Sequence, residues 1–154
     1  MRFADEANAG LHGDELRTWL QKRGVSNPLC FSWIPIGWTT LVDRLISALL
    51  DAGWDAQLMQ VKEKFGGLRF YTINQLDEDL QQLVQGFQQG SFRQCSLCEL
   101  PGELCVIWRG RLQTLCEAHQ VHFGAANEPD VPSMNINGKT IPPAMGEMRR
   151  KEQR

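Results

Sequence analysis

The sequence predicts an α+β fold, in which a small core of helices and one β-hairpin precedes a compact cysteine-rich module and a tail. Two observations predict the core: apolar residues recur at helical spacing in three segments and alternate with a period of two in a fourth. The third observation is that four of the five cysteines and two of the three histidines lie within residues 93–124. We therefore divide the 154 residues into a core (1–92), a module (93–124) and an extended or partly disordered tail (125–154).

The first helix is predicted over residues 14–24, where apolar residues share one face. Asp14 is its expected N-cap, because a carboxylate accepts hydrogen bonds from the free backbone N–H groups of a helix start, and Gly24 is its expected end. An apolar connector follows over residues 25–38, and its two prolines predict an irregular path.

The longest helix is predicted over residues 39–53, with Thr39 or Thr40 as its N-cap. Its apolar residues recur at helical spacing, at Leu41, Val42, Leu45, Ile46, Leu49 and Leu50. A third helix is predicted over residues 77–90, with Asp77 as its N-cap.

Residues 55–74 change the period to two, and two β-rich runs flank Gly66 and Gly67. Because glycine adopts the positive φ angles of a tight turn without strain, this pattern predicts a β-hairpin. Trp38 and Trp54 bracket the longest helix and are predicted core residues.

The module contains two pairs of potential metal ligands, Cys95-x2-Cys98 and Cys116-x2-His119, separated by seventeen residues. Each x2 spacing curls the backbone so that both ligand atoms reach one ion, and thiolates with imidazole are ligands that Zn²⁺ prefers. The apolar run after Gly102 fits a β-hairpin, and the second ligand pair fits the first turn of a short helix. This pattern predicts a treble-clef or ribbon-like zinc module.

Other interpretations of the module remain open. His122 or Cys105 could replace His119 as the fourth ligand, although a buried thiol in a strand is the simpler role for Cys105. A redox Cys-x-x-Cys motif would precede a helix, whereas this one precedes Pro101, and disulfides are rare in the cytosol.

No catalytic residue is predicted, and we expect that the protein is not an enzyme. Four protein ligands close the coordination sphere of a zinc ion and leave no position for a reactive water. Glu117 lies between two ligands, but in an order that differs from the signature of zinc deaminases. Gly-x-Ser-x-Gly is absent from the sequence, and Cys30 has no histidine companion apart from His12.

A protein partner is the expected ligand. Tryptophan and arginine are enriched at binding hot spots, and the predicted hairpin interleaves basic with aromatic residues, which is also typical of single-strand nucleic-acid platforms. The alternative is that the hairpin has no binding role. In that case one of its faces packs in the core, and the lysines of the hairpin are solvated. The candidate partner-binding residues are Trp33, Lys64, Arg69, Arg109 and Arg111.

Net charge and hydropathy limit the classes of partner and the cellular location that we expect. The formal net charge is −2, and acidic and basic residues are spread evenly along the chain, so direct nucleic-acid binding is not favoured. No apolar run approaches the length of a membrane span, and the N-terminal residues lack the apolar stretch of a signal peptide. We therefore expect a cytoplasmic protein.

Three blocks of the sequence resemble a family of small bacterial and phage proteins. The blocks are GWTTLVDRLISAL, QVKEKFGGLRFY and CSLCELPGELCVIWRGRLQTLCEAH, and together the resemblance covers about residues 37–119. Family members commonly have glycine after the second knuckle cysteine, where this chain has Glu99.

The resemblance implies a zinc module and no enzymatic activity. By analogy with other small proteins that have a stabilised core and no catalytic set, it suggests an immunity protein. Such a protein would bind a cognate bacterial toxin, such as a nuclease, and occlude its active site. The alternative is a nucleic-acid-associated regulatory or phage-related zinc protein.

Overall fold

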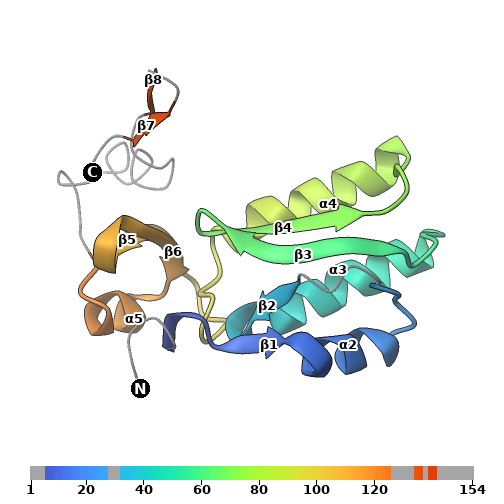
Figure 1. The fold of residues 1–154 in the computed structure, drawn as a ribbon, viewed down its shortest axis with the longest axis horizontal. Coiled ribbons are helices and arrows are strands. Elements are labelled where there is room, and N and C mark those ends of the chain that lie inside the picture. Colours follow the sequence, from blue (N-terminus) through green and yellow to red (C-terminus); the bar gives the residue numbers. More distant parts are fainter. Residues whose placement is uncertain (1–5, 28–31, 126–133, 137–138, 142–154) are drawn as a thin grey trace.

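The computed structural model describes residues 6–27, 32–125, 134–136 and 139–141, and it confirms the predicted α+β class. The helices are α2 (Gly13–Gln21), α3 (Thr39–Asp51), α4 (Glu78–Ser91) and α5 (Glu117–His122). The strands form four antiparallel pairs: β1 (Gly10–His12) with β2 (Trp33–Pro35), β3 (Leu58–Lys64) with β4 (Gly67–Thr72), β5 (Glu103–Ile107) with β6 (Arg111–Leu115), and β7 (Met134–Ile136) with β8 (Lys139–Ile141). In Figure 1, α2, α3, α4 and the β3–β4 hairpin form one body, and β5, β6 and α5 lie at one end of it.

The predicted caps of the first two helices are wrong. His12 is the N-cap of α2, and Asp14 lies in the first turn, where its negative charge still favours the positive end of the helix dipole. A 3-10 turn leads directly into α3, so Trp38 occupies the cap position and makes no capping bond. The hydroxyl of Thr39 instead donates to the carbonyl of Ile36 at 3.1 Å.

The prediction for α4 is confirmed at its start. Asp77 is the N-cap, and its carboxylate accepts a hydrogen bond from the backbone N–H of Leu80 at 3.0 Å. This bond satisfies one of the backbone donors that a helix start leaves without a partner.

The connector before α3 is more regular than its sequence predicts. Its last residues form β2, which pairs with β1 so that Leu11 lies opposite Ile34. Both strands have only three residues and lie more than twenty residues apart in the chain, so neither shows a strand pattern of its own. The pairing positions the segment before α2 alongside the start of α3.

The predicted hairpin is confirmed, with its turn one residue earlier than the two glycines. Phe65 and Gly66 form the two-residue turn, and both have positive φ angles, of 54° and 84°. Asn-Gly is the usual solution for such a turn, because a bulky residue with positive φ is strained. A bulge in β3 places Met59 and Gln60 opposite Tyr71.

Side chains cover both outer edges of this hairpin. On the β3 edge, the Ser32 hydroxyl accepts from the backbone N–H of Val61 at 3.0 Å. On the β4 edge, the Ser91 hydroxyl accepts from Leu68 N–H at 2.8 Å, and the Gln88 amide oxygen accepts from the N–H two residues further on at 2.9 Å. These three backbone donors are therefore not free to pair with another chain.

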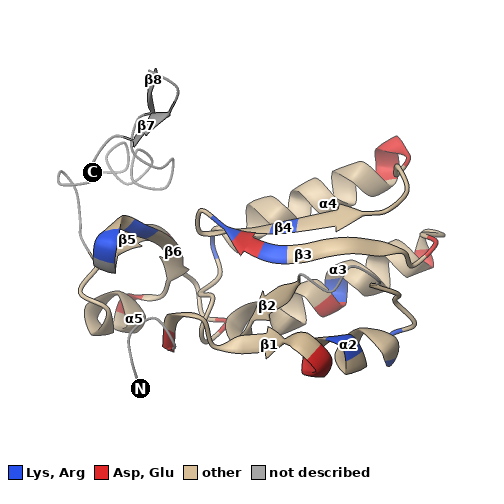
Figure 2. Cartoon of the chain, in the orientation of Figure 1, with Lys and Arg blue, Asp and Glu red and all other residues tan. Residues whose placement is uncertain are grey.

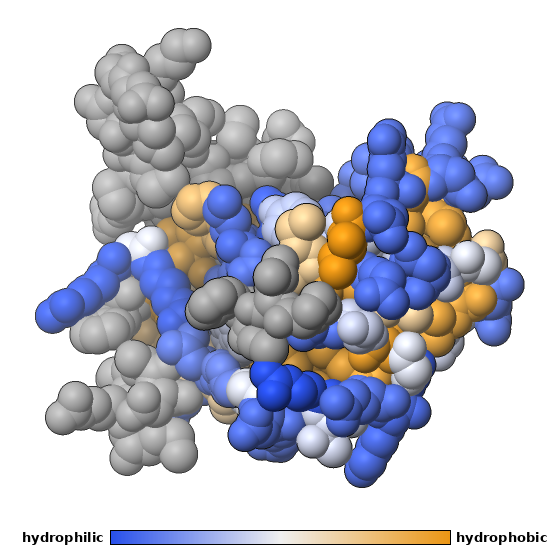
Figure 3. Space-filling view, turned by 45° about the vertical axis from the view of Figure 1, so that its right-hand side comes forward, coloured by the Kyte–Doolittle hydropathy of each residue, from blue (hydrophilic) through white to orange (hydrophobic). Residues whose placement is uncertain are grey.

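The main core lies between the helices and the inner face of the hairpin. Its most deeply buried members include Trp38, Leu20, Ile34, Leu45, Ile46, Leu49, Leu58 and Leu68. Trp54 also belongs to this cluster, so both predicted core tryptophans are confirmed. Figure 3 shows that hydrophobic surface breaks through between hydrophilic side chains in several places on this side of the molecule.

The predicted tail lies largely outside the described residues. Within it, the structure describes the short pair of β7 and β8, in which Asn135 lies opposite Thr140. None of the helices in the described part of the chain combines the length and the apolar character needed to span a bilayer.

Candidate metal centre

The β5–β6 hairpin and α5 form a second, smaller unit with its own apolar cluster. Cys95, Cys105, Leu115, Cys116 and Phe123 are the buried centre of this cluster together with Ala7 and Ile107. The strand pair fills the space between the two predicted ligand pairs, as the sequence predicts, and α5 begins directly after β6.

The four predicted ligands converge at the junction of the knuckle, β6 and α5. The Sγ atoms of Cys95, Cys98 and Cys116 and a ring nitrogen of His119 all lie within 4.8 Å of one another. The Nδ1 atom of His119 lies 3.2 Å from Cys116 Sγ and 3.4 Å from Cys95 Sγ, and Cys98 Sγ lies 3.5 Å from Cys116 Sγ. These residues could hold a metal ion, and all the described cysteines are free thiols.

The knuckle holds the first two thiols through its backbone. The N–H of Leu97 donates to Cys95 Sγ at 3.5 Å, and the N–H of Cys95 donates to the carbonyl of Leu100 at 2.7 Å. Glu99 has a φ angle of 71°, the left-handed conformation that glycine adopts without strain. Its carboxylate accepts a hydrogen bond from the Thr40 hydroxyl at 2.7 Å, so this residue ties the knuckle to the first turn of α3.

The second pair of ligands sits at the start of α5. Cys116 is the N-cap residue, and His119 follows in the first turn, so both side chains turn toward the knuckle. Gln120 fixes this start by donating from its side chain to the carbonyl of Leu115 at 2.9 Å.

The environment separates two of the thiols in acidity. Burial, together with the hydrogen bonds between its thiol and those of Cys116 and Cys95, raises the pKa of Cys98 to about 11, against the lowering effect of the Leu100 backbone. Burial also acts to raise the pKa of Cys116, but the backbone N–H groups of His119 and Ala118 and the adjacent thiols bring it below its usual value. Cys116 is therefore the thiol of this pair that loses its proton more readily.

The alternative ligands lie outside this cluster. His122 faces Glu6, with Nε2 and the carboxylate oxygen 3.0 Å apart. Cys105 is fully buried in β5, and its thiol donates to the carbonyl of Gln113 at 3.2 Å. His119 is therefore the imidazole that meets the three thiols.

The start of α3 packs directly against the knuckle. A Cβ atom on Gly37 would lie 2.2 Å from the carbonyl oxygen of Cys95, and the Gly37 N–H donates to the carbonyl of Ser96 at 2.8 Å. The Trp38 indole donates to the carbonyl of Gln94 at 2.8 Å, and the Gln94 side chain donates back to the carbonyl of Gly37 at 2.7 Å. The Gly-Trp pair therefore docks the longest helix onto the cysteine module.

The β3–β4 turn packs against the same unit from another direction. The buried hydroxyl of Thr114 donates to the carbonyl of Gly66 at 2.7 Å. A Cβ atom on Gly66 would meet the side chain of Leu104, and one on Gly67 would meet the Phe92 ring, each at 2.2 Å. The three sequence blocks that carry the family resemblance therefore meet at one junction.

The N-terminal segment closes this junction from outside. Gln113 is buried, and its amide donates to the carbonyl of Ala7 at 3.1 Å and to the Ser96 hydroxyl at 2.8 Å. Arg111 donates to the side-chain oxygen of Asn8 at 2.5 Å, and the pairing of Glu6 with α5 adds a third contact. Sequence patterns gave no signal for this segment, because its partners lie more than 100 residues away.

The predicted partner-binding residues fall into separate groups. Lys64 and Arg69 lie on the β3–β4 hairpin, and Arg109 and Arg111 lie at the turn of the β5–β6 hairpin. Trp33 lies elsewhere, half-buried in β2, where its ring stacks on His12 with centroids 5.1 Å apart. The structure therefore does not leave this tryptophan as a freely exposed anchor.

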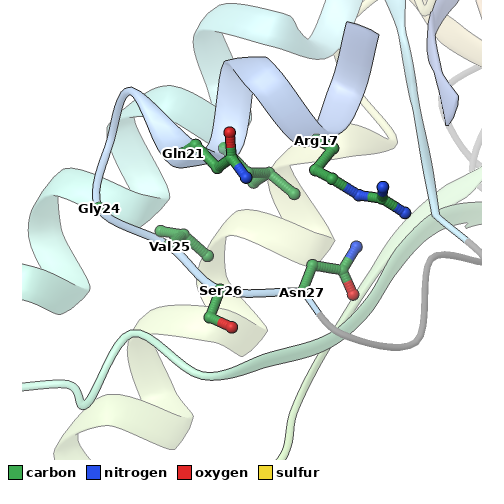
Figure 4. Close-up of a pocket in the computed structure, with 7 residues that line it drawn as sticks. Arg17, Gln21, Gly24, Val25, Ser26 and Asn27 are labelled. Carbon is green, nitrogen blue, oxygen red and sulfur yellow. The ribbon is translucent and has the colours of Figure 1, made fainter. Parts of the chain in front are cut away.

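Residues weighed for catalysis do not join the metal cluster. Glu117 is exposed at the start of α5, and Cys30 lies outside the described residues. A concavity of about 480 Å³ lies between α2 and the segment that follows it. Figure 4 shows Arg17, Gln21 and Asn27 around this concavity, and its described lining contains no cysteine, histidine or carboxylate.

Comparisons with protein-family models, with curated proteins and with solved structures found no match.

Proposed function

We propose that this protein is a zinc-stabilised binding module whose ligand is another protein, a bacterial toxin that it neutralises as an immunity protein. The observation that carries the proposal is the convergence of three thiols and one imidazole at the junction of the whole fold. A site at that position contributes to folding and needs no reactive water.

Three of the six separations among the ligand atoms lie near the values expected for zinc, and all six are within 4.8 Å. With Zn–S bonds of about 2.3 Å and a Zn–N bond of about 2.0–2.1 Å, a tetrahedral ion separates two sulfurs by about 3.8 Å and a sulfur from a nitrogen by about 3.6 Å. The observed separations of 3.5 Å between Cys98 and Cys116, and of 3.2 and 3.4 Å from the thiols to His119, lie within a few tenths of an ångström of these values. Three thiolates with one imidazole also favour zinc over the harder Mg²⁺ and Ca²⁺.

A structural role fits the site better than a catalytic one. Cys95, Cys98, Cys116 and His119 complete the four-coordinate sphere, so no ligand position is left for substrate or water. Glu99 and Glu117 each adjoin a ligand in the sequence, but both are exposed. We therefore propose that the protein is not an enzyme.

Protein binding is supported by the way the site rigidifies the fold. The knuckle is fixed to α3 through Gly37 and Glu99, and β6 is fixed to the β3–β4 turn through Thr114. A rigid scaffold lowers the entropic cost of presenting loops and hairpins to a partner. The assignment of the partner as a toxin rests on analogy with small immunity proteins.

Metal analysis tests the zinc site. The full chain, expressed in zinc-supplemented medium and dialysed, is expected to contain one equivalent of zinc by mass spectrometry. Substitution with Co²⁺ is expected to give thiolate-to-cobalt absorption and tetrahedral d–d bands. Protein that folds without metal, or Co²⁺ spectra of an octahedral site, would refute the structural zinc site.

Affinity capture tests the binding function. The tagged chain is incubated with nuclease-treated lysate of its native host, and retained proteins are identified and quantified. A single stoichiometric protein that inhibits growth when expressed alone, and is harmless when co-expressed with this chain, is expected. Retention of no protein would refute the protein-binding function.

A further inference from the structure

Positively charged side chains gather on the outer face of the β3–β4 hairpin, although acidic and basic residues are spread evenly along the sequence. Lys62 and Arg69 lie directly opposite each other on the two strands, and Lys64 shares their face because side chains of a strand alternate with a period of two. The described part of the chain gives none of these three residues an ion pair. Like charges placed opposite each other destabilise a sheet, so folding does not explain this arrangement.

The one carboxylate within this part of the hairpin belongs to the other face. Glu63 pairs with the fully buried Leu68 in the register, and its carboxylate accepts from the backbone N–H of Gly66 at 3.3 Å. Figure 2 shows lysine and arginine segments near the hairpin turn and a further group on the adjacent β5–β6 unit. The outer face itself therefore carries three positive charges without an ion pair among the described residues, and only Arg69 is attracted by the Glu63 carboxylate.

Phe65 adds an exposed aromatic ring to the tip of this face. The residue is 51% exposed, and its φ angle of 54° is strained for a bulky side chain. The Nζ atom of Lys64 lies 5.5 Å from the ring centroid, which places the ring beside the basic residues. The strained backbone conformation lowers the stability of the free protein, and the exposed ring leaves apolar surface in contact with water. Both costs point toward a binding role for this residue.

Apolar side chains continue the surface away from the tip. Met59, the extra residue of the bulge, and Tyr71, which lies opposite Gln60, are 39% and 40% exposed. Together with Ile73, they line a shallow groove beside α4. The surface thus combines aromatic, aliphatic and cationic groups, which is the composition of a protein interface.

We propose that this hairpin outer face, defined by Met59, Lys62, Lys64, Phe65, Arg69 and Tyr71, docks an acidic surface of the partner protein. Its carboxylates would meet Lys62 and Arg69, and an apolar pocket would accept the Phe65 ring. The inference rests on the proposed protein-binding function. Because backbone donors on both edges of the hairpin already have side-chain partners, the partner is contacted through the side chains of this face rather than by an added strand.

A protein partner fits this face better than single-stranded nucleic acid. Aliphatic Met59 and Ile73 offer no stacking surface for a base. The net charge of −2 also opposes binding to a long polyanion, whereas a local acidic patch meets only the local cations.

The test uses the full zinc-loaded chain with a photo-crosslinking phenylalanine at position 65, and at exposed Val121 on α5 as the matched control. Crosslinking is performed in host lysate at 50 and 500 mM NaCl. We expect one protein adduct from position 65 at low salt, an acidic crosslinked peptide, at least fivefold less adduct at high salt, and no matching adduct from position 121.

Charge reversal supplies a second readout with the isolated partner. Lys62→Glu/Arg69→Glu is expected to weaken its affinity at least tenfold, chiefly through slower association, and Phe65→Asn is expected to weaken it at least tenfold through faster dissociation. The control is Lys22→Glu/Arg44→Glu, which makes the same change of charge on exposed positions of the helices. This control is expected to change the affinity for the partner less than twofold.

The outcomes separate this inference from the function on which it rests. A partner that binds the hairpin variants as tightly as the wild type overturns the docking face and leaves the protein-binding function standing. A wild-type chain that retains no protein overturns both. Adducts with nucleic acid, or tight binding of a fluorescent fifteen-residue oligo(dT) that the charge reversal abolishes, would show that this face has a different class of partner.

Discussion

Gly37 lies so close to the knuckle that a Cβ atom there would stand 2.2 Å from the carbonyl oxygen of Cys95 and 2.5 Å from the carbonyl carbon of Ser96. Real Cβ atoms do not approach backbone atoms this closely, so the position admits only glycine without a backbone shift. The 3-10 turn that leads into the longest helix is therefore in direct contact with the backbone of a candidate metal ligand.

Gly37→Ala is expected to lower the free energy of unfolding by about 2–3 kcal/mol, because the added methyl group forces the helix and the knuckle apart. The measurement is urea unfolding of the zinc-loaded protein. Gly86→Ala is the control, since nothing lies within 4 Å of its Cβ position on α4. This change is expected to stabilise the protein by about 0.5–1 kcal/mol. Equal effects of the two substitutions would contradict the close contact.

Cys116→Ser is expected to abolish stoichiometric zinc binding and to lower the free energy of unfolding by more than about 3 kcal/mol, because the metal supplies folding energy. Cys105→Ser is the matched control, since this thiol lies outside the cluster and donates to Gln113. It is expected to keep its zinc and to cost about 1–2 kcal/mol. Zinc content is measured by mass spectrometry and stability by denaturant unfolding; loss of zinc from the Cys105 variant would implicate that thiol in binding.

Phe65→Asn is expected to stabilise the protein by about 0.5–1 kcal/mol, because asparagine tolerates the left-handed conformation that this turn requires. Phe65→Ala removes the ring but retains the strained conformation, so it is expected to bring no such gain. Thermal unfolding of both variants measures the difference. Destabilisation by asparagine would mean that the ring contributes packing energy that outweighs the strain of the turn.

Glu63→Gln is expected to raise stability at neutral pH. Burial raises the pKa of Glu63 above its usual value of 4.5, against the lowering effects of the Gly66 N–H and of Arg111 and Arg69. The native state therefore holds this proton more tightly than the unfolded chain, and ionisation costs stability as the pH rises through the folded pKa.

The amide of Glu63→Gln stays neutral and still offers an oxygen to Gly66, so it avoids that cost. The difference in unfolding midpoint between the variant and the wild type is expected to grow from pH 4.5 upward and then to level off. Both proteins are measured with bound zinc, since acid also releases the metal. A difference that is independent of pH would show that Glu63 is not the titrating group.

Local patterns in the sequence predict most of the elements correctly. The spacing of apolar residues predicts α3, Asp77 marks the start of α4, and the change of period predicts the β3–β4 hairpin. The paired x2 spacings predict all four members of the metal cluster, because backbone curvature alone brings each pair together. In each case the information lies within a few neighbouring residues.

The missed features depend on contacts between distant segments. The pairing of β1 with β2 satisfies backbone groups of residues that have no strand pattern of their own. Thr39 and Thr40 are good capping residues in isolation, but Trp38, which docks on Gln94, occupies the cap position one residue before Thr39. Likewise, the even distribution of charge along the chain conceals the gathering of Lys62 and Arg69 across two strands.

The hydrogen bond from Gln113 to Ala7 also constrains the order in which the molecule is assembled during synthesis. The two residues are 106 positions apart, and the chain leaves the ribosome with its N-terminus first. Residues 6–8 therefore emerge long before β6 and α5 exist to receive them. The helix-and-hairpin body is translated before the cysteine module, so residues 6–8 gain these partners only when the later module has been made.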